Sequence, residues 1–425
     1  MLFGIDMLAL QSKGPGEPES ARLGRRLVAA LLSGDPAHRY VLYVHEGLPT
    51  ERIPSARNAL RVTLPSILGG TEIVRPTVQK LLSHDPDGLD WLLLLDPFHP
   101  AYGGRPPESS LGGVKVASLV SDLSPHRVDD RRLAPLRKHD ALLAYAEAVA
   151  ADCRRRLPEA SARVARIGMG CEGPASQAGG SRPLDDATSR AFLDLGISGP
   201  FLLCHLADGS DRSGLGAALD AYHQLPPPLR ASHQLVVTGP VDDPWGALAY
   251  LHDHGCSEGL ILAGEVGEST ARALAAVCSA FLAPGLGGGS GLALLEALAC
   301  GAPVVFGDVG DQAEVVGEAG LLADPTDLSG RLAGLLADAG LGLDLRRKAL
   351  ARSAGFGWGG VAERLHAALR YGTPGPTGRR LRFDPPERAR GRLALFFAGS
   401  GGGDDGRAVP RGVGVPGDDS RGARG

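Results

Sequence analysis

The stretch that decides the fold is Ala280–Val305, AFLAPGLGGGSGLALLEALACGAPVV. It runs from a short apolar segment through a glycine-rich loop and an apolar helix-like segment to a second apolar segment. Because five glycines lie between positions 285 and 291, the backbone can approach a ligand closely. The helix that starts at Leu292 directs its N-terminal end at this loop, which predicts an anion site with Glu296 beside it. The alternative is a tight connection in which Glu296 is an ordinary solvated residue.

Three other glycine-containing motifs do not fit this loop. A P-loop requires a lysine, and the loop has none. The dinucleotide fingerprint GxGxxG fails, because its third glycine falls on Ser290, Leu292 or Leu294. A nucleophile elbow on Ser290 fails, because Leu292 stands where its second glycine belongs.

The same alternation of apolar and helix-like segments continues outward in both directions. Expected strands are Leu2–Asp6, Tyr40–Val44, Leu60–Leu64, Trp91–Asp96, Val114–Asp122, Ala141–Ala146, Val164–Gly168, Phe201–Leu206, Gln234–Thr238, Leu260–Ala263, Ala280–Ala283, Pro303–Phe306 and Gly320–Leu322. Expected helices include Ser20–Ser33, Ala148–Leu157, Leu215–Gln224, Ser269–Ser279, Leu292–Cys300, Thr326–Leu336, Leu341–Ala354 and Trp358–Arg370. Continuous apolar strands between helices indicate an α/β protein with parallel sheets.

The pattern falls into two blocks and an appendage. Residues 1–182 and 183–372 each predict a doubly wound, Rossmann-like domain, and a ligand is expected at the carboxyl ends of the strands. Residues 373–425 read as a linker and tail. From Gly399 to Gly425 the chain has ten glycines and few apolar residues, so we expect disorder there. Arg392–Phe397 (RLALFF) reads as a strand without an evident partner.

Composition limits the function classes. The 425 residues carry a formal charge of −4, which argues against a basic nucleic-acid-binding protein. The six cysteines are widely spaced, so we expect buried thiols rather than disulfides or a metal knuckle. The pair His252 and His254 lacks supporting carboxylates, so no metal site is expected. No secretory signal or membrane span is evident, which predicts a cytoplasmic protein.

The sequence resembles glycosyltransferases of family 4 (group 1), which have the GT-B fold. Gly289–Val305 (GSGLALLEALACGAPVV) and Glu314–Pro325 resemble the family's EGFGLPVLEAMACGTPVV and PEVVGDAGLLVDP stretches. Weaker matches are Gly4-Ile-Asp6, His38–His45, Val120–Pro125 (VSDLSP, resembling HDLIP) and Ala144–Asp152. The resemblance covers about residues 1–370.

This resemblance implies two domains facing each other across a cleft, with an NDP-sugar (UDP- or GDP-sugar) as donor and no permanently bound cofactor. It also implies retention of anomeric configuration and no metal. On the donor side, Glu296 would hold the nucleotide ribose, and Arg212 and the backbone of Gly289, Ser290, Gly291 and Leu292 would meet the diphosphate. The acceptor, a glycan or a lipid-linked precursor, would meet the catalytic candidate Asp122 and the N-terminal glycine loop with Gly14 and Gly16.

Departures from the family pattern leave the activity open. Gly288 stands where the first glutamate of E-x7-E belongs, Ser213 replaces the lysine that partners Arg212, and Ser121 replaces the histidine of HDLIP. The alternatives are therefore an impaired GT-B module that binds a sugar nucleotide or a protein, and a truncated piece of a longer transferase.

Two further surfaces are expected from position and charge. His99 and Tyr102 follow a strand where a doubly wound sheet opens to its ligand, so they are acceptor-side candidates. Arg154–Arg156, with Arg22, Arg25 and Arg26, could form a basic face that touches the inner face of the membrane or a lipid-linked acceptor. The alternative is an ordinary solvated surface.

Overall fold

A computed structural model describes most of the chain. The described residues are 1–11, 19–65, 78, 81, 87–102, 105–108, 114–123, 128–172, 186–206, 212–241, 243–255, 257–284, 291–307, 311–324 and 326–371. The predicted tail and the segment Arg392–Phe397 lie outside these residues.

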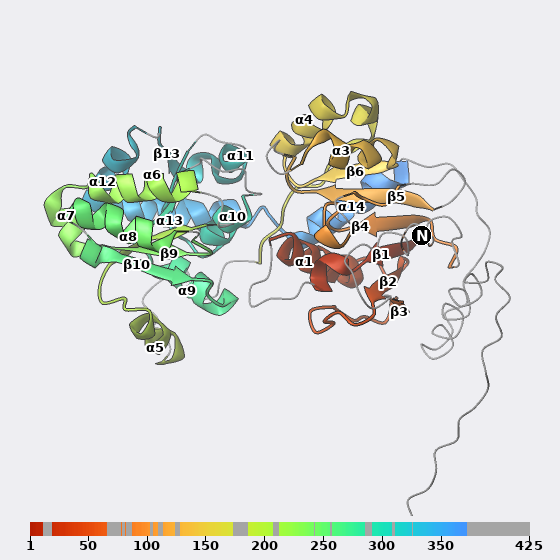
Figure 1. The fold of residues 1–425 in the computed structure, drawn as a ribbon, viewed down its shortest axis with the longest axis horizontal. Helices are drawn as coiled ribbons and strands as arrows, with labels where there is room; N and C mark the ends of the chain where they lie inside the picture. Colours follow the sequence, from red (N-terminus) through yellow and green to blue (C-terminus); the bar gives the residue numbers. More distant parts are fainter. Residues whose placement is uncertain are drawn as a thin grey trace, which may run out of the picture.

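The first domain is built on a seven-stranded parallel sheet with the spatial order β3-β2-β1-β4-β5-β6-β7 (Figure 1). Its strands are β1 (Leu2–Asp6), β2 (Arg39–His45), β3 (Ala59–Leu64), β4 (Trp91–Leu94), β5 (Lys115–Val120), β6 (Ala141–Ala144) and β7 (Val164–Arg166). Helices α1 (Glu19–Ser33), α3 (Asp130–Leu133) and α4 (Glu147–Arg156) accompany short 3-10 turns, η1 (Leu8–Gln11), η2 (Pro100–Tyr102), η3 (Ala134–Lys138) and η4 (Pro158–Arg163). All four residues of β4 are buried, as expected of a central parallel strand.

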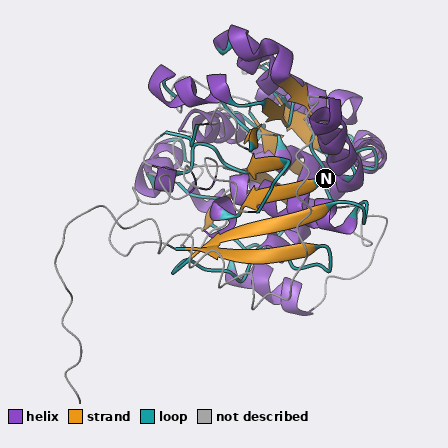
Figure 2. Ribbon diagram, turned by 90° about the vertical axis from the view of Figure 1, so that its right-hand side faces the viewer, coloured by secondary structure: helices purple, strands orange, loops and turns teal. Residues whose placement is uncertain are grey.

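The second domain has a six-stranded parallel sheet with the order β10-β9-β8-β11-β12-β13. Its strands are β8 (Phe201–His205), β9 (Gln234–Thr238), β10 (Leu260–Gly264), β11 (Ala280–Ala283), β12 (Val304–Phe306) and β13 (Gly320–Leu322). Its helices are α5 (Asp186–Asp194), α6 (Arg212–His223), α7 (Pro227–Ser232), α8 (Pro244–Asp253), α9 (Glu268–Val277), α10 (Leu292–Ala299), α11 (Gln312–Val316), α12 (Leu328–Ala337) and α13 (Ala339–Ser353), with the turns η5 (Ser257–Gly259) and η6 (Gly317–Ala319). Figure 2 views the molecule from the side of the first domain and shows helices packed around the strands.

The structure confirms the predicted α/β architecture with two parallel sheets. Each of the thirteen segments expected as strands forms one, with ends that shift by at most a few residues. The five described cysteines are buried free thiols, as expected. No helix among the described residues is long and apolar enough to cross a membrane.

The last described helix, α14 (Trp358–Tyr371), returns to the first domain (Figure 1). Its buried side chains pack in the core with residues of α1, and the Tyr40 hydroxyl lies 3.0 Å from Nε2 of His366. Arg364 donates from Nε to the carbonyl of Ile167 at 2.6 Å. The range expected for the second domain, 183–372, therefore ends in a helix whose packing partners belong to the first.

The two chain crossings between the domains lie side by side. The amide of Cys171, after β7, donates to the carbonyl of Phe356, just before α14, at 2.8 Å. Met169 and Cys171 also belong to one buried apolar cluster that contains residues of both domains, such as Phe3 and Leu295. The domains are thus joined through a shared core as well as through the chain.

We expect Leu365→Ala to lower the free energy of unfolding of the first domain by about 2–5 kcal/mol. Leu365 lies on α14, is 1 % exposed and packs in the shared core, so its truncation leaves a cavity there. Denaturant unfolding followed by tryptophan fluorescence would measure this, because Trp91 is buried in the first domain.

Glu363→Ala is the matched control, since Glu363 is exposed on the same helix. Its effect should stay within about 0.5 kcal/mol. Equal effects of the two substitutions would contradict the packing role of α14.

Candidate functional site

The second sheet has a switch point between β8 and β11. From β8 the chain adds β9 and β10 on one side, and it then adds β11, β12 and β13 on the other. Ligands of open parallel sheets bind outside the carboxyl ends of the strands at such a point. His205 ends β8, and Ala283 ends β11 ahead of the segment that leads into α10. We call this place the second switch point.

Gly291 sets the start of α10 at this switch point. It is the N-cap residue and has φ +68°, in the left-handed region that favours glycine. A Cβ here would lie 3.0 Å from Cγ2 of Val315 and 3.2 Å from Oδ2 of Asp311. The helix that follows is largely buried, beginning with Leu292 at 1 % exposure. The glycine therefore lets the chain enter a helix that is fixed in the core.

Glu296 projects from α10 toward the first domain. Its Oε2 lies 3.2 Å from Nη1 of Arg22 on α1, and both side chains are 20 % exposed. Burial raises the pKa of Glu296, although the guanidinium groups of Arg22 and Arg26 act in the opposite direction. The residue is therefore not a solvated helix residue but a largely desolvated carboxylate, and its ion pair among the described residues is the one with Arg22. Such a carboxylate is suited to accept hydrogen bonds from ligand hydroxyls.

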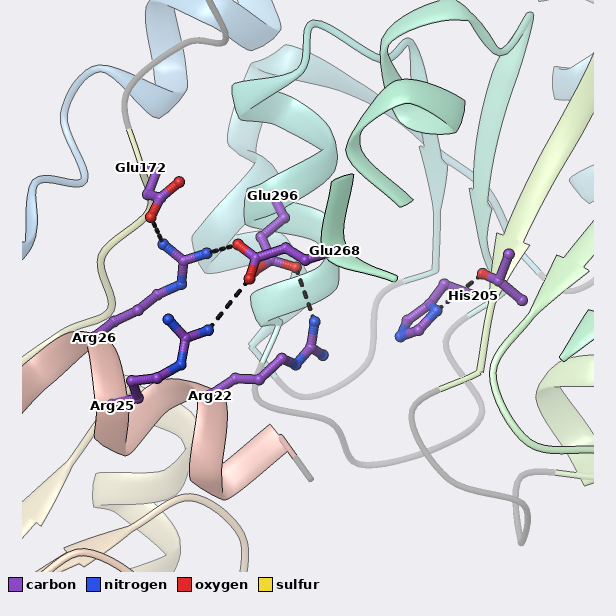
Figure 3. A network of polar contacts seen from close by, with 8 residues as sticks. Arg22, Arg25, Arg26, Glu172, His205, Glu268 and Glu296 are labelled. Atoms are coloured by element: carbon purple, nitrogen blue, oxygen red, sulfur yellow. Dashed lines mark hydrogen bonds and ion pairs between the residues drawn. The ribbon is translucent and has the colours of Figure 1, made fainter. Parts of the chain in front are cut away.

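His205 is a site residue that the sequence did not single out. Its Nδ1 lies 3.0 Å from Oγ1 of Thr238, which ends the neighbouring strand β9. Burial, and then the charge of Arg22, lower the pKa of His205 to about 4, so the imidazole is neutral at pH 7. In Figure 3 its ring points from β8 toward the side where Arg22 and Glu296 meet. The sequence feature that could have identified His205 is its place as a polar residue at the end of an apolar strand.

The α1 arginines, Arg22, Arg25 and Arg26, connect the two domains (Figure 3). Arg25 lies 3.2 Å from Glu268 at the start of α9, and Arg26 pairs with both Glu268 and Glu172. Arg26 is the most buried of the three, with a side chain that is 6 % exposed. The contacts with Glu296 and Glu268 form a row of ion pairs between α1 and the second domain, and Glu172 adds one from the segment after β7.

The basic face expected from the arginines is therefore not a free surface. The α1 arginines face acidic residues of the second domain, and Arg154 lies 2.7 Å from Glu147. Arg156 donates to the carbonyls of Leu123 and Val128. Sequence alone could not show these partners, because the acidic residues that hold α1 lie about 150 to 270 positions away.

A second contact between the domains involves Glu314 on α11. Its carboxylate accepts from the backbone amide of Glu147 at 2.7 Å and pairs with Arg166 at the end of β7. Arg352 of α13 donates to the backbone carbonyl of Glu314, which holds this segment in place. The stretch that begins at Glu314 was singled out by sequence, and the structure gives it an interdomain role.

The first sheet has its own switch point, between β1 and β4, where Asp6 ends β1. Asp6 is 2 % exposed; its Oδ1 lies 2.8 Å from Nε2 of His45 and accepts from the amide of Leu8 at 3.0 Å. The Tyr102 hydroxyl donates to Oδ2. Burial raises the pKa of this carboxyl, but His45, Tyr102 and the Leu8 amide together hold it below its usual value. The cluster fixes the edge of the first sheet around an ionised carboxylate.

The acceptor-side candidates lie along this edge. Tyr102 is 2 % exposed and its hydroxyl is bonded to Asp6, so it supports that carboxylate. His99 is half-buried, its Nδ1 accepts from the amide of Ala101 at 3.2 Å, and burial lowers its pKa. Asp122 is half-buried and lies two residues beyond β5. Sequence reasoning missed Asp6 and His45 as site residues, because each is an isolated residue at the end of a strand.

Several predicted site residues lie outside the described part of the chain. They are Gly14, Gly16, Gly288, Gly289 and Ser290. Arg212 begins α6, directly after β8, but its side chain and that of Ser213 are likewise outside the description. Their predicted contacts with a diphosphate remain predictions.

Comparison with known proteins gives the second domain a family match. Residues 207–338 match the family described as "Glycosyl transferases group 1". A curated relative, the O-antigen chain mannosyltransferase B of Escherichia coli, is 37 % identical over 118 residues, which are 28 % of this chain and 31 % of that protein. The chain thus spans about a third of the length of this relative.

Solved structures match almost the whole described fold. WaaG, a glycosyltransferase involved in lipopolysaccharide biosynthesis, aligns with a TM-score of 0.60 and 16 % identity, covering 88 % of this chain and 100 % of that one. Anabaena Alr3699/HepE in complex with UDP and glucose aligns with a TM-score of 0.61 and 17 % identity, covering 87 % and 99 %. At such identities the likeness establishes the fold.

We expect Gly291→Ala to destabilise the second domain by more than Gly264→Ala does. Both glycines have positive φ, +68° and +62°, so alanine at either position costs about 1–2 kcal/mol of backbone strain. Only at Gly291 would the new Cβ also meet Val315 and Asp311, whereas nothing lies within 4 Å at Gly264. Thermal unfolding of the two variants would measure the difference. Equal decreases in the melting temperature would mean that Val315 and Asp311 move to accommodate the new Cβ at no measurable cost.

We expect Asp6→Asn to lower the free energy of unfolding by about 2–3 kcal/mol at pH 7, because a buried charged hydrogen-bond acceptor is lost. The folded-state pKa of Asp6 lies below its ordinary value of 3.8, so this stability is present above pH 3.8 and is lost as the pH falls through the folded pKa. From pH 7 downward, the free energy of unfolding of the variant should lie below that of the wild type by a constant amount. This difference should disappear only at the acid end of the range, near pH 3.

Asp194→Asn, at an exposed position of α5, controls for removal of a carboxylate. Its curve should follow that of the wild type within about 0.5 kcal/mol. A gap for Asp6→Asn that closes already near pH 6 would assign the effect to another group.

Proposed function

We propose that this chain, a GT-B protein of the group 1 glycosyltransferase type, transfers a sugar from a nucleoside-diphosphate sugar to a glycan or lipid-linked acceptor. The observation that carries the proposal is the second switch point. There a desolvated Glu296 and a neutral His205 lie at the carboxyl edge of the sheet, in the domain that matches the family.

On the donor side, Glu296 would accept hydrogen bonds from the ribose hydroxyls, as carboxylates do at other switch-point nucleotide sites. Its burial supports this role, because a desolvated carboxylate gains more from a new donor than a solvated one does. The start of α10 at Gly291 and Leu292 would meet the diphosphate with the positive end of the helix dipole, together with Gly289, Ser290 and Arg212.

On the acceptor side, His99 and Asp122 would meet the acceptor, and Tyr102 would act through Asp6. We include Gly14 and Gly16 here on the resemblance. In the transfer, the acceptor hydroxyl oxygen bonds to the anomeric carbon while the bond from that carbon to the diphosphate oxygen breaks. The electron pair stays with the diphosphate, which also takes the hydroxyl proton. Such a step depends on stabilising the charge that develops on the leaving diphosphate.

Three details of the proposal rest on the family resemblance rather than on the geometry of the site. They are retention of configuration, transfer without a metal and action in the cytoplasm. A mannosyl donor is the first candidate because one relative is a mannosyltransferase, and UDP-sugars are the second because HepE was solved with UDP and glucose. We do not extend the proposal to membrane contact, because the arginines that suggested it are paired within the chain.

A second candidate function is binding without efficient transfer. Gly288 and Ser213 replace two charged residues of the family pattern, which favours an impaired module. The two functions differ in whether nucleoside diphosphate is released.

We expect the chain to release nucleoside diphosphate from at least one sugar in a panel of GDP- and UDP-sugars, GDP-mannose included, when oligosaccharide acceptors are present. Glu296→Gln should lower that rate about 10- to 100-fold, because a lost charge-assisted contact is worth about 1.5–3 kcal/mol. Coupled detection of the released diphosphate would measure both rates.

Glu318→Gln, at an exposed position in η6, is the matched control and should retain the wild-type rate. If binding is detected but no donor is turned over faster than by Glu296→Gln, the chain is a binding module. If calorimetry detects no nucleotide binding at all, transfer and nucleotide binding both fail, and the module that remains is one that binds a protein.

A further inference from the structure

Arg22 belongs to the first domain by sequence but lies at the second switch point. It projects from α1 and reaches Glu296 on α10, with Nη1 3.2 Å from Oε2. Its charge also acts on His205, whose pKa it helps to lower. One guanidinium is thus in range of both described side chains that mark the predicted nucleotide site.

The three α1 arginines are not equivalent. Arg25 and Arg26 share Glu268, and Arg26 also pairs with Glu172, so these two residues form the fixed part of the contact. Among the described residues, Arg22 pairs with one carboxylate, that of Glu296, which is assigned to the ribose, and its Nε has no hydrogen-bond partner there. At 20 % exposure, the Arg22 side chain remains open to an incoming ligand.

The predicted donor carries charge that this site must meet. A nucleoside-diphosphate sugar brings two negative charges, and the family's lysine is replaced by Ser213. His205 cannot supply a positive charge at neutral pH, because its pKa is about 4. Arginine is well suited to the task, since its planar fork binds phosphate in two-point fashion and stays charged.

We propose that Arg22 binds the donor diphosphate from the opposite domain, and that Glu296 holds its guanidinium in position while the site is empty. This rests on the proposed function, since it names a further diphosphate-binding residue for that reaction. When the nucleotide binds, the ribose hydroxyls take over Glu296 and the Arg22 fork turns to the phosphates. The first domain then supplies part of the charge that the second domain lacks.

The test compares Arg22→Gln, Arg22→Lys and Arg25→Gln with the wild type. Arg25 is the matched control, because it lies on the same helix and pairs with Glu268, which Arg26 also holds. Affinities for GDP, UDP and the corresponding nucleosides are measured by calorimetry, or by ligand-observed NMR where binding is weak. Thermal unfolding of each variant reports on folding.

We expect Arg22→Gln to weaken binding of the preferred diphosphate about 10-fold or more, which is 1.4 kcal/mol or more. Binding of its nucleoside should change less than 3-fold. Arg22→Lys should recover most of the loss, because a lysine keeps a charge that can reach a phosphate. Arg25→Gln should bind the diphosphate as the wild type does.

Three results would overturn the inference. If Arg22→Gln weakens the nucleoside and the diphosphate equally, Arg22 acts only by orienting Glu296. If it binds the diphosphate like the wild type, Arg22 contacts no phosphate, although the proposed function stands. A wild-type chain that binds neither diphosphate would refute the proposed function and this inference together.

Discussion

The return of α14 to the first domain is the constraint on which the rest of the structure depends. Val361, Leu365 and Leu369 are fully buried, and burial of such side chains contributes about 1.5–3 kcal/mol each. Because α14 follows the second sheet in the chain, this packing ties the second domain to the first at the point where Cys171 meets Phe356. The arginines of α1 are thereby held within ion-pair distance of Glu296 and Glu268. A residue of the first domain can therefore reach the second switch point.

The carboxylates at the two switch points have pKa values shifted in opposite directions. Asp6 is the more buried, yet its pKa is lowered, because His45, Tyr102 and a backbone amide all stabilise its charge. Glu296 has a raised pKa, because the charges of Arg22, Arg26 and Arg272 do not offset its desolvation. A carboxylate whose oxygens already have enough hydrogen-bond partners gains little stabilisation from a ligand. A desolvated carboxylate with too few partners gains much more. Asp6 therefore fits a supporting role, and Glu296 fits a binding role.

The sequence predicts the sheets well because the information is local. Buried parallel strands read as continuous apolar runs, and Gly291 lies in a glycine-rich run beside an apolar helix. The amphipathic pattern of α14 predicts a helix but does not say which domain covers its apolar face. The α1 arginines read as a basic surface, because Glu296 and Glu268 lie more than 240 residues further along the chain. His205 and Asp6 carry no spacing that marks them, and only the topology of each sheet makes their positions informative.

The departures from the family pattern and the contact between the domains both bear on how the charge of a bound diphosphate would be neutralised. A second domain with Ser213 in place of the family's lysine would bind a diphosphate weakly if it had to neutralise the charge alone. In the proposed site Arg22 would remove that requirement, because its guanidinium lies 3.2 Å from Glu296 of α10. The charge at the proposed donor site would then depend on the position of α1, which is set by the packing of α1 against α14. Binding of the donor and the relative placement of the domains would be linked, since each would stabilise the arrangement that the other requires.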